Sequence, residues 1–263
     1  MFRQRLLSSL IGIPVVLAMA WAGGLLFFLL LLTIGLLALR EFYTLTGVDD
    51  RYLSCLGYVG HVVLLSLCWQ FGFQVYAAGL IGFFMVLNIY WILTFPRDFH
   101  RLATLIWGKL YVTTLIGIFL LLRGLDVGFI AILTVFITIW ASDGGAYLIG
   151  MTVGKRKLIP AVSPKKSLEG AIGGILFAAL AMATIAPYIG TGRVSAALMG
   201  IVLSMVGQLG DLAESALKRW SNIKDSGSFL PGHGGALDRL DSLLFAAPVA
   251  YILFTTLLSR GGQ

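Results

Sequence analysis

The chain has 263 residues, of which 59% are hydrophobic and only 12% are charged. A soluble domain carries about 25% charged residues, so this composition excludes an ordinary soluble protein and places most of the chain in lipid. The formal net charge of +7 is not a nucleic-acid signal, because basic residues of membrane proteins gather in cytoplasmic loops and near anionic headgroups.

In chain order, long apolar runs predict an all-α, polytopic integral membrane protein. A membrane-spanning helix needs about 20 mostly apolar residues, and windows of that kind predict about nine spans. They lie at roughly 6–22, 24–39, 53–70, 75–95, 103–122, 127–149, 171–190, 194–214 and 241–259. Although Arg3 and Arg5 give the first run the basic start of a signal peptide, a second run follows at once, which favours a retained span. We expect one membrane domain over residues 1–263, with N-terminal helices in 1–125 and the catalytic helices and cytoplasmic loops in 126–263.

The lysines and arginines test this order of spans. On one side of the membrane lie only Arg123, Arg193 and Arg260, and Lys109 lies inside a span. Every other one of the 19 lysines and arginines lies on the side of the N-terminus. Basic loops face the cytoplasm, so we expect a cytoplasmic N-terminus, an external C-terminus and a site at the cytoplasmic face of a bacterial inner membrane.

Two predicted cytoplasmic segments, 150–170 and 215–240, are too long and too polar for tight turns. If the eighth helix continues into the second, four polar residues share one helical face at i, i+3, i+4 and i+7: Asp211, Glu214, Ser215 and Lys218. Glu214 and Lys218 can form an ordinary ion pair. Asp211 lies deeper and has no such local partner. Acids near a membrane are costly unless paired or bound to a cation, so Asp211 is a candidate metal ligand.

A glycine-rich loop follows, and its ordinary interpretation is a flexible connection. Glycines also let a backbone approach phosphate oxygens closely. The chemistry-bearing residues of this loop are Lys224, Asp225, His233, Gly234 and Gly235. Charged groups among the glycines favour an anion-binding site.

The last span opens with Asp238 and Asp241, spaced i, i+3 with Arg239 between them. Helix capping explains any one such aspartate. Two carboxylates at the mouth of a span also suit Mg²⁺, which proteins hold with carboxylates and substrate phosphates. We expect these aspartates to complete a metal site with Asp211.

The first polar segment has its own candidates. Asp143 lies in an otherwise apolar span and is expected to face the protein interior. Lys165 and Lys166, with Ser163 and Ser167 on either side, are expected to bind phosphate, although a basic patch against anionic lipid is the alternative.

Residues 215–241 resemble the signature of the phosphatidate cytidylyltransferase (CDP-diacylglycerol synthase) family. The matching positions are Ser215, Lys218, Arg219, Lys224, Asp225, Leu230 to Gly235, Asp238, Arg239 and Asp241. Blocks at 142–147 and 163–170 look like two upstream blocks of that family, so the resemblance covers roughly residues 140–245. Two positions depart from the family pattern: Gly144 and Ala236 stand where a hydroxyl residue and a larger aliphatic residue are usual.

The resemblance implies that CTP and phosphatidate react to give CDP-diacylglycerol and pyrophosphate in phospholipid biosynthesis. Expected partners are CTP, phosphatidate and membrane lipids, with no nucleic acid, and a homodimer stays open. Mg²⁺ is the expected cofactor, with a second monovalent or divalent cation as an alternative. The expected catalytic residues are Asp211, Lys218, Arg219, Lys224, Asp238, Arg239 and Asp241, of which the three aspartates bind metal. The expected substrate contacts are Asp143, Ser163, Lys165, Lys166, Ser167, Ser215, Asp225, His233, Gly234 and Gly235.

Two other classes of protein fit part of the pattern. A CTP-dependent polyprenol or phytol kinase transfers the γ-phosphate, and the long pattern at 215–241 argues against it. A transporter suits intramembrane acids, but its polar groups gather near the midplane rather than at one face. The Asp-Gly-x-x-Ala-Arg motif of CDP-alcohol phosphotransferases is absent from the sequence.

Overall fold

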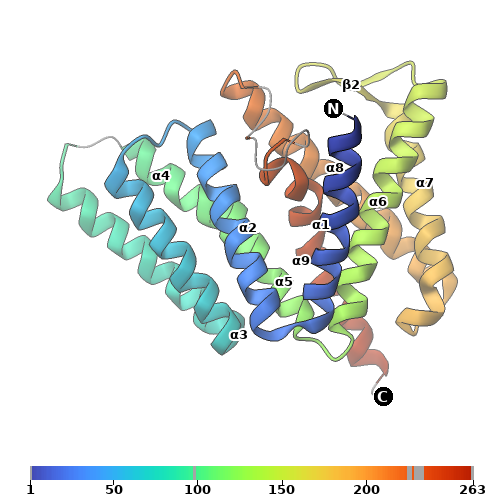
Figure 1. The fold of residues 1–263 in the computed structure, drawn as a ribbon, viewed down its shortest axis with the longest axis horizontal. Coiled ribbons are helices and arrows are strands. Elements are labelled where there is room, and N and C mark those ends of the chain that lie inside the picture. Colours follow the sequence, from blue (N-terminus) through green and yellow to red (C-terminus); the bar gives the residue numbers. More distant parts are fainter. Residues whose placement is uncertain (1, 97–98, 224–226, 228–233, 262–263) are drawn as a thin grey trace. The chain divides into compact units, whose positions relative to one another are not determined.

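The structure is a computed structural model that describes residues 2–96, 99–223, 227 and 234–261. These residues are mainly helical, which confirms the predicted all-α membrane class (Figure 1). The α-helices are α1 (Phe2–Ala22), α2 (Gly24–Leu45), α3 (Arg51–Leu93), α4 (Phe99–Gly108), α5 (Leu115–Arg123), α6 (Gly128–Val153), α7 (Leu168–Ile185), α8 (Arg193–Trp220) and α9 (Leu237–Gly261). A π-helical turn (Lys109–Thr114) joins α4 to α5, and a 3-10 turn (Ala186–Ile189) follows α7.

A short antiparallel ribbon, β1 (Lys157–Ile159) and β2 (Ser163–Ser167), connects α6 to α7. It falls in the polar segment expected at 150–170, where no strand was predicted. Figure 1 shows the ribbon beyond the ends of α6 and α7.

Among the described residues, seven helices are long and apolar enough to cross a membrane. The predicted number of nine is therefore not confirmed. The difference arises at α1, of which the stretch Leu10–Ala22 is described with its side chains and is apolar but shorter than a span, and at α3. The 43 residues of α3 take the place of two predicted spans, 53–70 and 75–95.

Helix α3 is broken in its middle at Gly72, where φ is 79° and ψ is −171°. Glycine adopts a positive φ without the steric cost that a Cβ would bring. The halves then pack against each other: a Cβ added at Gly79 would lie 2.8 Å from a methyl carbon of Leu67. A straight helix of 43 residues would be about 65 Å long, twice the thickness of the hydrocarbon core. The break divides it into two pieces of span length.

The chain forms two compact units. The first contains Met1–Leu121 and Ile223–Leu237, and the second contains Leu122–Asn222 and Asp238–Gln263. In the first unit, the charge of Lys109 is buried inside the span that contains it. Its ammonium donates a hydrogen bond to the carbonyl of Gly57 and lies 5.4 Å from the centre of the Phe83 ring. A carbonyl and an aromatic face stabilise a buried cation.

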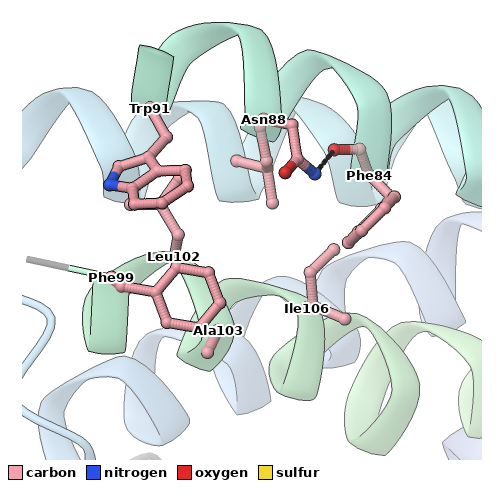
Figure 2. A pocket seen from close by; sticks show the side chains of 8 residues that line it. Phe84, Asn88, Trp91, Phe99, Leu102, Ala103 and Ile106 are labelled. Atoms are coloured by element: carbon pink, nitrogen blue, oxygen red, sulfur yellow. Dashed lines mark hydrogen bonds between the residues drawn. The ribbon is translucent and has the colours of Figure 1, made fainter. Parts of the chain in front are cut away.

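The first unit also carries an open pocket between α3 and α4 (Figure 2). Its lining residues are Phe84, Leu87, Asn88, Trp91, Phe99, Leu102, Ala103 and Ile106. The amide of Asn88 donates a 2.8 Å hydrogen bond to the carbonyl of Phe84 in its own helix. Because the lining is apolar and contains no residue of the predicted site, we assign the pocket no part in the chemistry.

In the second unit, α6, α7 and α8 pack with close backbone contacts. A Cβ added at Gly173 of α7 would lie 2.5 Å from the Cβ of Ile149 in α6. Ser142 and Ser204 join α6 to α8 through a 2.7 Å hydroxyl contact. The amide of Gln208 donates to the Ser204 hydroxyl and to the carbonyl of Ala171, at 3.1 Å each. This polar network fixes the three helices that carry the candidate site.

Candidate functional site

Helix α8 provides the central face of the site. It continues to Trp220, so the face expected from the spacing of its polar residues does form. The Ser215 hydroxyl lies 3.4 Å from Asp211 Oδ1, and Lys218 Nζ lies 2.5 Å from Glu214 Oε2. The ordinary ion pair expected between Glu214 and Lys218 is confirmed.

Strand β2 supplies the partner of Asp211. The ammonium of Lys166 forms an ion pair with the Asp211 carboxylate, and both side chains are about one third exposed (30% and 31%). Lys165 is exposed, and successive side chains of a strand point to opposite faces. The two lysines therefore point in different directions, and the ion pair with α8 is made by Lys166.

Arg219 attaches the ribbon to the end of α8. Its Nε donates a 3.2 Å hydrogen bond to the carbonyl of Val162, in the turn between β1 and β2. A guanidinium has five N–H donors, so this contact leaves donors for a ligand. Arg219 thus holds Lys166 beside the acidic face of α8.

Helix α9 packs against α8 at Gly210, one residue before Asp211. A Cβ added at Gly210 would lie 2.9 Å from the Cβ of Phe245 and would also meet the carbonyl of Asp241. Because glycine lacks that carbon, Asp241 comes close to Asp211. One turn earlier in α9, Asp238 Oδ1 accepts a 2.6 Å hydrogen bond from Lys218 Nζ.

The acidic side chains fall into two neighbouring groups. Asp143, Asp211 and Asp241 lie close enough to interact electrostatically with one another and with Lys166. We call these four residues the acid cluster. Asp143 was expected to face the interior of the protein. The residue is exposed, and its carboxylate interacts with Asp211 and Lys166 of this cluster.

The second group consists of Glu214, Lys218 and Asp238. Glu214 is fully buried, whereas Lys218 and Asp238 keep 16% and 12% of their side-chain surface. One ammonium thus lies between two carboxylates. Glu214 also interacts electrostatically with Asp241 of the acid cluster. Since carboxylates outnumber ammonium groups across both groups, the site attracts cations.

In the part of the chain that the structure describes, no three acidic, histidine or cysteine side chains are arranged to hold a metal ion. Asp238 is paired with Lys218, whereas Asp143 lies with Asp211 and Asp241. Carboxylate oxygens are nevertheless the ligands that Mg²⁺ prefers, and it usually keeps waters and substrate phosphates as further ligands. The donor chemistry of the acid cluster therefore fits Mg²⁺, with Asp143 beside the two expected aspartates.

The remaining predicted residues lie outside the two groups of charged side chains. The Ser167 hydroxyl accepts a 3.1 Å hydrogen bond from the Gly170 N–H and so caps α7. Ser163 is half-buried at the start of β2, and Arg239 is exposed. Gly234, with φ of 81°, and Gly235 belong to the first compact unit. Three predicted residues lie outside the described residues: Lys224, Asp225 and His233.

Sequence reasoning missed Glu169, which orders the ribbon. Its Oε2 accepts hydrogen bonds from the N–H groups of Lys155, at 3.0 Å, and Arg156, at 3.1 Å. Its position two residues after the Ser167 cap, in the first turn of α7, was the available signal, because acids favour helix N-termini.

The chain is similar to known proteins over nearly its whole length. Residues 3–257 match the profile of the cytidylyltransferase family. The chain belongs to the cytidylyltransferase family. It is 35% identical to the phosphatidate cytidylyltransferase of Bacillus subtilis (strain 168), over 95% of this chain and 97% of that protein. Staphylococcus epidermidis and Staphylococcus aureus have proteins of the same name that are 34% and 33% identical, each over 95% of this chain and 98% of the relative. The family resemblance seen at residues 140–245 thus extends over nearly the whole chain.

Proposed function

We propose that this cytidylyltransferase family member transfers the cytidylyl group of CTP to phosphatidate, giving CDP-diacylglycerol and pyrophosphate. The observation that carries the proposal is the joining of β2, α8 and α9 by ion pairs, with carboxylates in excess, in a chain of apolar helices. Family membership and the names of the relatives support the same reaction.

The chemistry joins two anions. A phosphate oxygen of phosphatidate attacks the α-phosphorus of CTP, a new P–O bond forms, and the bond to the β-phosphate breaks with its electrons leaving on pyrophosphate. The second pKa of a phosphomonoester is near 6, so the nucleophile is already ionised at neutral pH and needs no general base. The main barrier is repulsion, at about 4 kcal/mol for each pair of unit charges 4 Å apart at an effective dielectric near 20.

The cations of the site offset this repulsion. Lys166 and Lys218 place ammonium groups among the carboxylates, and we assign them to phosphate oxygens of the bound substrates. Arg219 and Arg239 are exposed and are assigned to the same anions, because guanidinium groups match phosphate geometry. Ser215, which contacts Asp211, is a neighbouring hydrogen-bond donor.

Mg²⁺ would be held by one or two carboxylates of the acid cluster (Asp143, Asp211 and Asp241), with substrate phosphates and waters as further ligands. It would neutralise charge on the phosphates in the transition state. Before substrates bind, the Lys166 ammonium neutralises part of this cluster. Asp238 holds Lys218 in place from α9.

We also propose that this end of the second unit faces the cytoplasm. Asp143 and Asp211 lie ten and nine residues before the ends of α6 and α8, which is about 15 Å along a helix. A lipid phosphate can then reach the acid cluster while its acyl chains stay in the bilayer, and CTP enters from water.

A labelled-CTP assay tests the proposal. Purified protein is given phosphatidate, Mg²⁺ and CTP labelled at the α- or the γ-phosphorus. The α-label should enter the lipid fraction and the γ-label should leave as pyrophosphate. Adding EDTA or omitting phosphatidate should stop both the transfer of the α-label to lipid and the release of the γ-label as pyrophosphate. Transfer of the γ-label to a lipid alcohol would establish the kinase alternative, and folded protein with no CTP turnover over a range of lipids would favour a transporter.

A further inference from the structure

A buried carboxylate in the first compact unit holds the segment that leads into α9. Glu41, near the end of α2, is only 8% exposed. Its Oε1 accepts a 2.8 Å hydrogen bond from the N–H of Ala236, and its Oε2 accepts one of the same length from the N–H of Leu237. One carboxylate thus takes two consecutive backbone donors.

These two donors need partners. The first N–H groups of a helix have no acceptor within the helix, and α9 begins at Leu237. Ala236 and Leu237 are both buried, so water does not readily replace a lost acceptor. A carboxylate is the strongest side-chain acceptor for such groups, because its charge strengthens the bonds and suits the helix dipole.

The same carboxylate meets the chain a second time. A Cβ added at Gly227 would lie 2.5 Å from Oε1 and 2.8 Å from Cδ of Glu41. The backbone at Gly227 therefore lies directly against this side chain. Glu41 contacts both ends of the stretch from Gly227 to Leu237, within one compact unit.

We propose that Glu41 is a positioning residue that anchors the segment leading into α9, through the N–H groups of Ala236 and Leu237 and its contact with Gly227. Through that segment it places Asp238, Arg239 and Asp241, which follow Leu237 directly in the chain. This role rests on the proposed function, because it acts through residues assigned there. The hydrogen bonds described for Glu41 go to backbone N–H groups of this segment.

The chemistry at Glu41 needs two acceptor oxygens at this distance. Glutamine in the same place keeps one acceptor and points an NH₂ donor at an N–H donor, whereas aspartate is one methylene shorter. Glu41→Gln therefore preserves size while removing the bidentate contact. Asp50 offers a matched control in the same unit: its Oδ1 accepts from the N–H groups of Tyr52 and Leu53, at 2.9 and 3.2 Å, and caps α3.

The experiment compares Glu41→Gln with Asp50→Asn in full-length protein in detergent. Hydrogen exchange of peptides covering residues 234–240 is measured together with kcat and KM for CTP. Glu41→Gln should speed exchange in those peptides and lower kcat about 10- to 100-fold, as expected for misplaced reacting groups. Asp50→Asn should change neither. Gly227→Ala, which keeps Glu41 but pushes a methyl group against it, should shift both readouts in the same direction as Glu41→Gln.

Unchanged exchange at 234–240 in Glu41→Gln, or wild-type kcat despite faster exchange, would overturn the positioning role. So would equal losses in Glu41→Gln and Asp50→Asn. If Glu41→Gln does not fold, Gly227→Ala decides in the same way, with unchanged exchange and kcat counting against the proposal. Wild-type protein that fails to transfer the α-label to lipid would refute the proposed function instead, and the exchange result would still test the anchor.

Discussion

Lys218 Nζ donates a 2.6 Å hydrogen bond to Asp238 Oδ1 and thereby ties α8 to the first turn of α9. The same ammonium lies 2.5 Å from Glu214 Oε2, on the fully buried side chain one turn before it in α8. Two carboxylates therefore share one ammonium group. Removing one partner of a buried ion pair leaves an uncompensated charge, which costs more than the pair itself contributes.

Lys218→Met should consequently destabilise the protein by about 3–5 kcal/mol. Adding Glu214→Gln to Lys218→Met should recover part of that loss, because it removes the buried carboxylate that Lys218 neutralised. Denaturant unfolding in detergent measures the free energy of unfolding of the single and the double variant. A double variant no more stable than Lys218→Met would show that Glu214 is not held by Lys218.

The two adjacent lysines of β2 should differ in their effect on catalysis. Lys166 pairs with Asp211, whereas Lys165 is exposed on the other face of the strand. Lys166→Ala should lower kcat/KM about 100-fold, as losing one charge-stabilising donor does, and Lys165→Ala should lower it far less. Equal losses in steady-state assays would mean that both lysines bind phosphate, as the sequence alone suggested.

The acid cluster should set the dependence on Mg²⁺. Asp143→Asn, Asp211→Asn and Asp241→Asn should each raise the Mg²⁺ concentration needed for half-maximal activity, because each removes a negative charge from the acid cluster that attracts the cation. Glu169→Gln is the matched control, since that carboxylate binds the Lys155 and Arg156 N–H groups instead. An aspartate variant with a wild-type Mg²⁺ titration would be removed from the proposed ligands.

Local patterns predicted the parts of the fold and site that depend on spacing along one helix. Apolar runs gave the helices, and the i, i+4 relation of Glu214 and Lys218 gave their ion pair. The glycine break in α3 falls between the predicted spans 53–70 and 75–95. The β-ribbon was not predicted, because its strands are defined by pairing between two segments.

The partners of individual site residues depend on tertiary contacts and could not be predicted from spacing along one helix. Asp211 had no visible local partner, and its ion pair comes from Lys166 in another element. Glu41 contacts residues 195 and 196 positions later in the chain. Its helix resembled a generic membrane span, so composition carried no sign of a role near the site. Strand alternation could have separated Lys165 from Lys166 if the ribbon had been recognised.

The orientation of the chain depends on whether α3 crosses the membrane once or twice. Each half has about the length of one span, and the break at Gly72 allows the chain to turn there. If both halves cross, the N-terminus lies on the same side as the ribbon between α6 and α7. That arrangement also places most lysines and arginines in the cytoplasm. A single crossing would put the basic ribbon outside.

Reporter fusions that are active only outside the cytoplasm distinguish these cases. A fusion after Gln74 should give signal and one after Thr94 should not, because the two halves of α3 cross in opposite directions. Within residues 155–160 a fusion should be silent, and at Gln263 it should be active. Matched fusions to a reporter active only in the cytoplasm control for expression and should give the reverse pattern. Signal after both Gln74 and Thr94, with the ribbon fusion active, would place the acid cluster on the external side and remove its access to cytoplasmic CTP.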